Sequence, residues 1–204
     1  MLVNRGVQDQ PLFGRFTGVE HSFGRIRTSA EHRKRGVGSI RSGLPPGSRS
    51  RSSRRSAGIV LHRRNDGALQ VLLVHPGGPA WARRDLGAWS IPKGECEPDE
   101  EPLAAARREF EEELGTAPPG GEAADLGEIS QKSGKKVRAF ALAGDLDVAA
   151  VRSNKFLFEW PPRSGRMIEI PEVDRAEWFA IDAAREKINP AQVTLLERLQ
   201  ERQE

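Results

Sequence analysis

The sequence predicts a mixed α/β fold that follows a long basic N-terminal segment, and three observations support this prediction. Short apolar runs typical of strands recur from Ala57 onward, one amphipathic helix interrupts them, and a second helical pattern lies near the C-terminus. The 204 residues are enough for one ordinary domain with an appendage. We therefore expect a domain over residues 57–204 and a separate tail over residues 1–56.

The elements follow in a clear order. The first two strands flank the turn residues Asn65, Asp66 and Gly67, which favour a hairpin. A Gly/Pro loop begins at Pro76, and the dipeptide Asn189-Pro190 opens the final helix. The expected strands cover residues 57–64, 69–75, 125–130, 136–142, 155–160 and 175–181, and the clearest helix covers residues 102–114.

Charge divides the chain into two parts. Residues 1–56 hold 12 Lys/Arg and three acidic residues, a net charge of +9, whereas the remaining 20 basic and 26 acidic residues give −6. The Arg/Ser-rich run over residues 43–56 lacks the apolar content needed for a core, so we expect a disordered tail. The alternatives are an RNA-binding arm, a membrane-surface patch, a transit peptide or a start site assigned too far upstream. The Arg-Ser run has no interspersed aromatic residues, which argues against nucleic acid as a partner.

Several classes of protein are disfavoured by composition. The single cysteine, Cys96, excludes an internal disulfide framework and a cysteine-rich zinc site. No apolar run approaches the roughly 18 residues of a transmembrane helix, and the N-terminus lacks the apolar stretch of a secretory signal. We expect a soluble cytoplasmic protein with no membrane partner.

The helix over residues 102–114 carries the candidate chemistry. Its apolar stripe consists of Leu103, Ala106, Phe110 and Leu114. Glu109, Glu112 and Glu113 lie beside that stripe within about a quadrant of one another. Each like-charged pair at this spacing costs about 0.2–0.5 kcal/mol, so stability alone does not favour the cluster. The alternative is a solvated acidic face partly paired with Arg107 and Arg108.

The segment around this helix matches a long pattern. From Gly94 the sequence reads GECEPDEEPLAAARREFEEELGT, with Glu100 after five intervening residues and Arg108 after seven more. This segment, residues 94–116, resembles the Nudix box at every fixed position except Thr116, where the family usually has an aliphatic residue. The resemblance implies an α/β/α sandwich with a mixed sheet that hydrolyses a diphosphate linked to another moiety.

The resemblance also implies roles for individual residues. Glu112 and Glu113 are the expected ligands of Mg²⁺, with Mn²⁺ as an alternative, because hard cations prefer carboxylate oxygens. Glu109 is expected to be a ligand or the general base, Arg108 to orient it, and Gly94 to offer its backbone carbonyl to the metal. Such a cation can neutralise a diphosphate and activate water.

Three further acidic residues are candidates near the site. Glu100 either joins the metal shell or serves as a charge at the helix entry, and the two interpretations carry equal weight. Family members often place a catalytic acid outside the box, and Glu172 is the first candidate here, with Glu159 behind it. His62 and His75 are expected to be structural, since hard cations do not seek imidazole.

The substrate expectation begins with the segment WSIPKG, residues 89–94. A Trp ahead of Pro-Lys-Gly resembles the branch that cleaves dinucleoside polyphosphates, and also the diphosphoinositol polyphosphate branch. Lys93 is expected to contact phosphate next to the metal. The leading activity is asymmetric hydrolysis of diadenosine tetraphosphate to ATP and AMP, with a nucleotide polyphosphate as the small-molecule partner.

Other residues are weaker candidates for substrate binding. Lys132 and Lys135 lie in a basic turn that could contact phosphates or be a solvated hairpin tip. Trp81 is the expected exposed stacking platform, and Arg83 beside it could contact phosphate, whereas Trp89 and Trp178 are expected in the core. The rival functions are hydrolysis of other nucleoside or inositol diphosphates, a nucleotide sensor that does not cleave, and RNA binding through the tail. The sequence does not indicate an oligomeric state.

Overall fold

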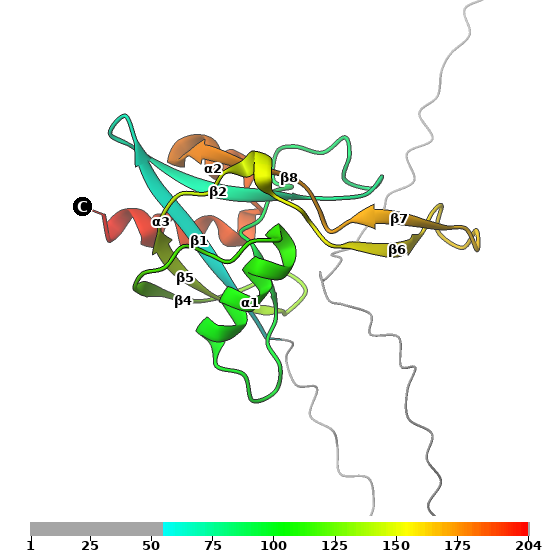
Figure 1. The fold of residues 1–204 in the computed structure, drawn as a ribbon, viewed down its shortest axis with the longest axis horizontal. Coiled ribbons are helices and arrows are strands. Elements are labelled where there is room, and N and C mark those ends of the chain that lie inside the picture. The colour runs from blue at the N-terminus through cyan, green and yellow to red at the C-terminus, as the bar shows by residue number, and fades with distance from the viewer. Residues whose placement is uncertain (1–54, 204) are drawn as a thin grey trace, which may run out of the picture.

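The computed structural model describes residues 55–203, and its main element is a six-stranded mixed sheet (Figure 1). The predicted disorder of the tail falls almost entirely outside the described residues. The first strand, β1 (Arg55–Asn65), begins two residues before the expected start and turns into β2 (Ala68–Pro76). Asp66 and Gly67 have φ values of 47° and 80°, so both central residues of the turn adopt the positive φ of a tight hairpin.

Strand β1 is central and pairs on both sides. The sheet order is β4 (Ala123–Ser130), β5 (Lys136–Ala143), β1, β2 and β8 (Val173–Ala180). β1 runs parallel to β5 and antiparallel to β2, and the short β3 (Lys93–Glu95) pairs antiparallel with the start of β1. The pairing of Gly94 with Ala57 therefore ties the Gly94 loop to the middle of the sheet.

Helices cover both faces of the sheet. One face packs against α1 (Pro102–Leu114), whose Phe110 and Leu114 are fully buried among side chains of β1 and β5. The other face packs against α2 (Ile181–Lys187) and α3 (Val193–Glu201), with Trp89 in the same cluster. Burial of a side chain such as Phe110 contributes about 1.5–3 kcal/mol. The fold is the expected α/β sandwich with a mixed sheet.

A two-stranded hairpin stands apart from the main sheet. It consists of β6 (Lys155–Glu159) and β7 (Met167–Pro171), and it projects from one end of the domain (Figure 1). The strand β7 and the helix α2 were not predicted, and the expected strand over residues 175–181 ends at Ala180 because the chain turns into α2 there. Two single turns of 3-10 helix, Val148–Ala150 and Pro190–Gln192, complete the elements.

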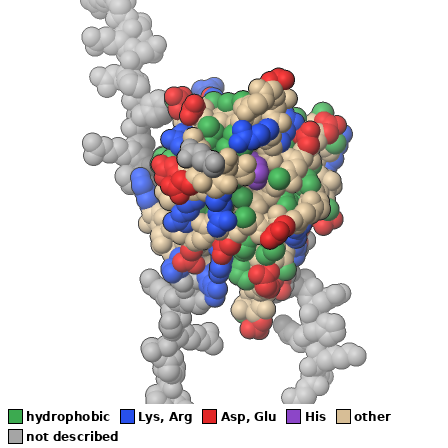
Figure 2. All heavy atoms as spheres, turned by 90° about the vertical axis from the view of Figure 1, so that its left-hand side faces the viewer, with side chains coloured by type: hydrophobic (Ala, Val, Ile, Leu, Met, Phe, Trp, Pro, Cys, Tyr) green, Lys and Arg blue, Asp and Glu red, His purple; other side chains and the backbone are tan. Residues whose placement is uncertain are grey.

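The opposite end of the domain carries charges of both signs. Figure 2 shows this end, where basic and acidic side chains are interspersed and neither sign dominates. Among the described residues, no helix is long and apolar enough to cross a membrane.

Candidate active site

Local sequence fixes both ends of α1. At the start, the Glu101 side chain accepts a hydrogen bond of 2.9 Å from the Ala104 N–H, and Pro102 occupies the first helical position. At the end, Gly115 adopts a left-handed conformation with φ 71° and donates its N–H to the Glu111 carbonyl. The buried apolar stripe then sets the rotation of the helix, so Glu109 and Glu113 lie toward β3.

Arg108 holds three carboxylates and the backbone of the loop before the helix. Its Nε and Nη2 donate to the two oxygens of Glu100 at 2.8 and 2.9 Å, and its Nη1 donates to Glu109 at 2.8 Å. Nη1 also lies 3.5 Å from Glu112, and Nη2 donates to the Glu95 carbonyl at 3.0 Å. The planar guanidinium suits this forked geometry. Charge-assisted bonds hold the pKa of Glu100 down, at about 2, and that of Arg108 above its usual range.

Gly94 and Glu109 are in direct contact. A Cβ atom placed on Gly94 would lie 1.8 Å from Glu109 Oε2, so only glycine fits at this position. Burial raises the pKa of Glu109, and the Arg108 guanidinium opposes that shift. The missing side chain thus lets a half-buried carboxylate reach the backbone of β3.

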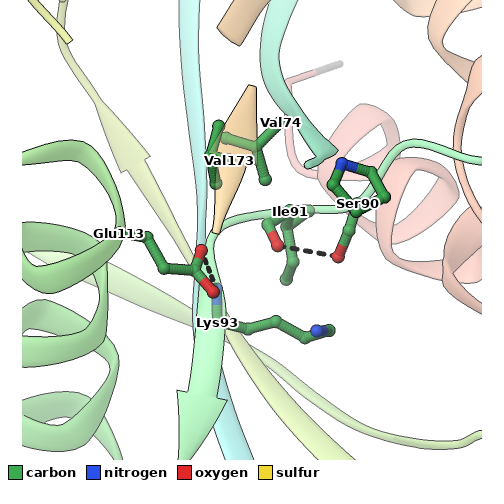
Figure 3. Close-up of a pocket in the computed structure, with 7 residues that line it drawn as sticks. Val74, Ser90, Ile91, Lys93, Glu113 and Val173 are labelled. Atoms are coloured by element: carbon green, nitrogen blue, oxygen red, sulfur yellow. Dashed lines mark hydrogen bonds between the residues drawn. The ribbon is translucent and has the colours of Figure 1, made fainter. Parts of the chain in front are cut away.

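Glu113 is the most buried acidic residue of the cluster, with 3% of its surface exposed. It reaches from α1 to β3 and accepts a hydrogen bond of 3.1 Å from the Lys93 N–H (Figure 3). Burial raises the pKa of Glu113 to about 8, with a further contribution from the negative charge of Glu172. In this environment, a positive charge next to the carboxylate stabilises its ionised form.

Glu172 lies between β7 and β8 at the base of the projecting hairpin. Its backbone N–H donates to the Asn154 carbonyl at 2.8 Å, and its carbonyl accepts from the Gly77 N–H at 3.0 Å. The next residue, Val173, donates its N–H to Ser153 Oγ. The residue is therefore fixed on both sides of its backbone, and its charge acts on Glu113. The structure thus brings the candidate acid outside the box close to the acidic face of α1.

Lys93 is buried, with 6% of its surface exposed, which rules out an ordinary solvated lysine. In Figure 3 its side chain points away from the Glu113 carboxylate. Successive residues of a strand point to opposite faces, and the next residue, Gly94, faces Glu109 of α1. The positive charge of Lys93 nevertheless favours the ionised form of Glu113.

The segment that leads into β3 is held by a residue that the sequence did not reveal as important. Gln192 is 1% exposed, its Oε1 accepts from the Ile91 N–H at 3.0 Å, and its Nε2 donates to Ser90 Oγ at 3.0 Å. A cavity of about 10 Å³ lies beside this segment and is lined by Ser90, Ile91, Lys93, Glu113, Val74, Pro76 and Val173. A lone glutamine far along the chain carries no sequence signal for this role.

The other predicted substrate contacts are not gathered at one point. Trp81 is half-buried rather than exposed, and the guanidinium of Arg84 lies 5.2 Å from its ring centre. Arg83 is exposed in the same loop. In the turn between β4 and β5, Lys132 is exposed and Lys135 is 5% exposed, so the two do not form one solvated tip.

Further aromatic and polar residues have structural roles. As expected, Trp89 is fully buried, and Trp178 packs against the core and donates to the Leu146 carbonyl at 3.1 Å. His75 is also buried, between the Asp174 carboxylate and the Arg84 carbonyl, at 2.7 Å from each. Glu159 accepts the Gly165 N–H at 2.7 Å, which places its carboxylate in the hairpin turn.

The donor set fits a hard divalent cation. Glu109, Glu112 and Glu113 offer only oxygen, and Gly94 leaves the backbone of β3 open to them. The burial of the Glu113 carboxylate beside Glu109 is the observation that most favours a cation nearby. As the side chains lie, three metal-binding groups do not converge on one point within residues 55–203, because Arg108 and the Lys93 N–H engage the carboxylates.

This chain belongs to the Nudix family, since the model of the NUDIX domain matches residues 52–199. The domain is that of the Nudix pyrophosphohydrolases, which generally use divalent metals. A search of curated proteins gave no match.

Solved structures with the same fold include two with named ligand or enzyme context. A Caenorhabditis elegans Ap4A hydrolase in a binary complex is 21% identical, with 72% of this chain and 97% of that chain covered and a TM-score of 0.51. The NUDIX domain of Shewanella oneidensis NrtR, complexed with ADP ribose, is 19% identical, with coverages of 76% and 91% and a TM-score of 0.53. At these identities the likeness concerns the fold alone.

Proposed function

We propose that this chain is a Mg²⁺-dependent Nudix pyrophosphohydrolase whose leading activity is the asymmetric cleavage of diadenosine tetraphosphate to ATP and AMP. The observation that carries the proposal is the contact of Glu109 with Gly94, next to the buried Glu113 on the same helix. Stability alone does not favour buried like charges on one helix face, whereas chemistry on an anionic substrate does.

Four groups would hold the cation. Glu112 and Glu113 are the principal ligands, Glu109 and the Gly94 carbonyl complete the set, and Glu100 stays with Arg108 as a support. When bound, Mg²⁺ would neutralise the diphosphate and lower the pKa of the attacking water.

The chain's own residues would then orient the reactants. Arg108 would keep Glu109 in place, as its hydrogen bond of 2.8 Å supports. Glu172 would accept the proton of the attacking water, because it lies near Glu113 yet belongs to another element. Lys93 would act through its buried charge, which favours both ionised Glu113 and an anionic substrate.

The choice of substrate rests on the WSIPKG segment, residues 89–94. The fold shared with an Ap4A hydrolase supports the choice only at the level of the fold. The ADP ribose in the NrtR complex makes other nucleoside diphosphates the first alternatives. Arg83, Trp81 and Lys132 would contact separate distal parts of a long substrate, whereas the buried Lys135 would act through its charge. We infer a cytoplasmic location from the single cysteine.

The test is to incubate the protein with diadenosine tetraphosphate and Mg²⁺ and to separate the products by anion exchange. We expect ATP and AMP from the native chain and no turnover from Glu112→Gln or Glu113→Gln. The matched control is Glu111→Gln, because Glu111 is exposed on the same helix and should retain full activity. Unchanged turnover in both site variants would refute the site.

Other products separate the alternatives. Two ADP molecules would indicate a symmetric cut. If diadenosine tetraphosphate is not cleaved, other nucleoside diphosphates and inositol diphosphates are the next substrates to test. Tight nucleotide binding without cleavage of any of these would instead support a sensor.

A further inference from the structure

The β6–β7 hairpin carries an aromatic face. Side chains alternate along a strand, and residues directly opposite each other share a face. The register pairs Phe156 with Ile170 and Phe158 with Ile168, and the Trp160 N–H donates to the Arg166 carbonyl just beyond. One face therefore contains Phe156, Phe158, Trp160, Ile168, Ile170 and Arg166, and we call it the aromatic face.

The three aromatic rings form a row. Phe156 and Phe158 meet edge-on with ring centres 6.4 Å apart, and Phe158 and Trp160 are 6.4 Å apart with nearly parallel planes at 25°. Phe156 is 43% exposed, and the other two rings are half-buried. Phe156 therefore presents a ring to solvent beside two partly covered rings, an arrangement suited to stacking against a planar ligand.

The aromatic face is continuous with the candidate active site. Ile170, at the base of this face, is covered by the loop after β2, since a Cβ on Gly78 would lie 2.8 Å from Ile170 Cδ1. The adjacent Gly77 donates its N–H to the Glu172 carbonyl. Glu172 in turn lies near Glu113. The row of rings therefore begins at Phe156, the cross-strand partner of Ile170, which is two residues before Glu172, and it leads outward along the hairpin.

Distances along the hairpin suit a nucleotide. Two residues of strand span roughly 7 Å, so Phe156 lies about that far from Glu172 along the ladder and Phe158 about twice as far. A base joined through its ribose to a phosphate near α1 falls in this range. At the outer end, Arg166 lies across from Trp160 and adds positive charge for an anionic ligand.

The size of the face argues against a second copy of the chain. Two five-residue strands offer a face of roughly 160 Å², from a rise of about 3.3 Å per residue and a strand spacing of about 4.8 Å. A stable protein–protein interface needs about 800 Å² from each partner. A face of this size instead matches a single planar group.

We propose that the aromatic face of the β6–β7 hairpin binds the base of the nucleotide whose phosphates lie against the acidic residues of α1. This inference rests on the proposed function, because it assumes phosphates at that site. It assigns the hairpin to base recognition and the box to the diphosphate. The rings bind by stacking, which tolerates different bases.

The test compares two probes that differ only in whether they carry a base. Calorimetric titration with ADP and with inorganic tripolyphosphate, in Mg²⁺, is carried out on the native chain and on Phe156→Ala. We expect the dissociation constant of ADP to rise roughly 5- to 150-fold, the range of one lost stacking contact, and that of tripolyphosphate to stay unchanged. Phe156→Trp should restore ADP binding.

The matched control is Leu157→Ala, because Leu157 is 66% exposed on the opposite face of the same strand. It should bind both probes as the native chain does, and circular dichroism should show native folding of both variants. Unchanged ADP binding in Phe156→Ala, or equal weakening of both probes, would overturn the inference. So would sedimentation showing a native dimer that Phe156→Ala dissociates while ADP affinity stays the same.

The binding measurement does not depend on turnover. If the native chain cleaves no diadenosine tetraphosphate, the proposed substrate fails, but selective loss of ADP binding in Phe156→Ala still supports base recognition. If cleavage occurs and ADP binding is unchanged, only the inference about the hairpin fails.

Discussion

Arg108 donates two parallel hydrogen bonds, of 2.8 and 2.9 Å, to the carboxylate of Glu100, which lies eight residues earlier in the sequence. The same guanidinium reaches Glu109 with its remaining nitrogen. The loop before α1 and the acidic face of α1 are therefore joined through one planar group, and changes to this group should affect both folding and activity.

Replacement of Arg108 by Lys keeps the positive charge but removes the planar guanidinium with its several N–H donors. A point-like ammonium cannot hold Glu100 and Glu109 together, so we expect kcat/KM to fall about 10- to 100-fold, as for other partners of metal ligands. The free energy of unfolding should fall by about 1.5–3 kcal/mol for the lost charged hydrogen bonds. Steady-state kinetics and urea unfolding measure the two effects. Arg107→Lys, at an exposed hydrogen bond to the Gly121 carbonyl, should change neither by much.

Gly94→Ala should displace Glu109, since the added Cβ would lie 1.8 Å from Glu109 Oε2. A shift of about 1 Å at a reacting group can cost roughly 100-fold in rate, and overpacking costs about 1–3 kcal/mol in stability. Gly120→Ala is the control, because a Cβ there meets nothing within 4 Å. In the double variant Gly94→Ala/Glu109→Ala, stability should recover while turnover does not. Full activity of Gly94→Ala would contradict the contact.

Gln192→Ala should leave the buried Ile91 N–H without its acceptor at 3.0 Å. An unsatisfied buried group costs about 1–3 kcal/mol, so thermal unfolding should move to lower temperature by the corresponding amount. The same glutamine also holds Ser90 in the segment that leads to Lys93, so we expect a higher KM for the substrate as well. Gln203→Ala, at an exposed position near the C-terminus, should match the native chain in both measurements.

Asp85 should make stability depend on acid pH. Hydrogen bonds from Lys187 and then from Trp89 Nε1 hold the pKa of Asp85 below its ordinary value of 3.8. The stabilisation is therefore complete above pH 3.8 and is lost as the pH falls through the lower folded value. The difference in unfolding free energy between the native chain and Asp85→Asn should be constant near neutral pH and shrink in acid. Parallel pH profiles of the native chain and Asp85→Asn would refute the assignment.

The helix and the acidic cluster were predictable because their signals are local. The stripe of α1, its proline start and its glycine end all lie within one short stretch, and the structure confirms each of them. The expected burial of Trp89 was confirmed as well. The helix α2 was missed because Ile181–Lys187 spans seven residues, too few for a helical period to emerge from the apolar run before it.

The parts that were not predicted depend on contacts between distant residues. The burial of Lys93 follows from the pairing of β3 with β1, and the role of Gln192 depends on a contact across 101 residues. The strand β7 has only five residues and lies among turn residues, so its pairing with β6 leaves no signal in the sequence. The residues around Lys93 and Gln192 in the sequence do not distinguish either of them from an ordinary exposed residue.

The separate ladder of the β6–β7 hairpin has a consequence for motion. A two-stranded ribbon is at best marginally stable without a third strand, and here the main sheet supports it only at its base. Its backbone hydrogen bonds can open while those between β1 and β5 stay closed, so its amide hydrogens should exchange with solvent much faster. A nucleotide seated on the rings would slow that exchange, and the part of the domain that selects the ligand would also be the part that the ligand makes rigid.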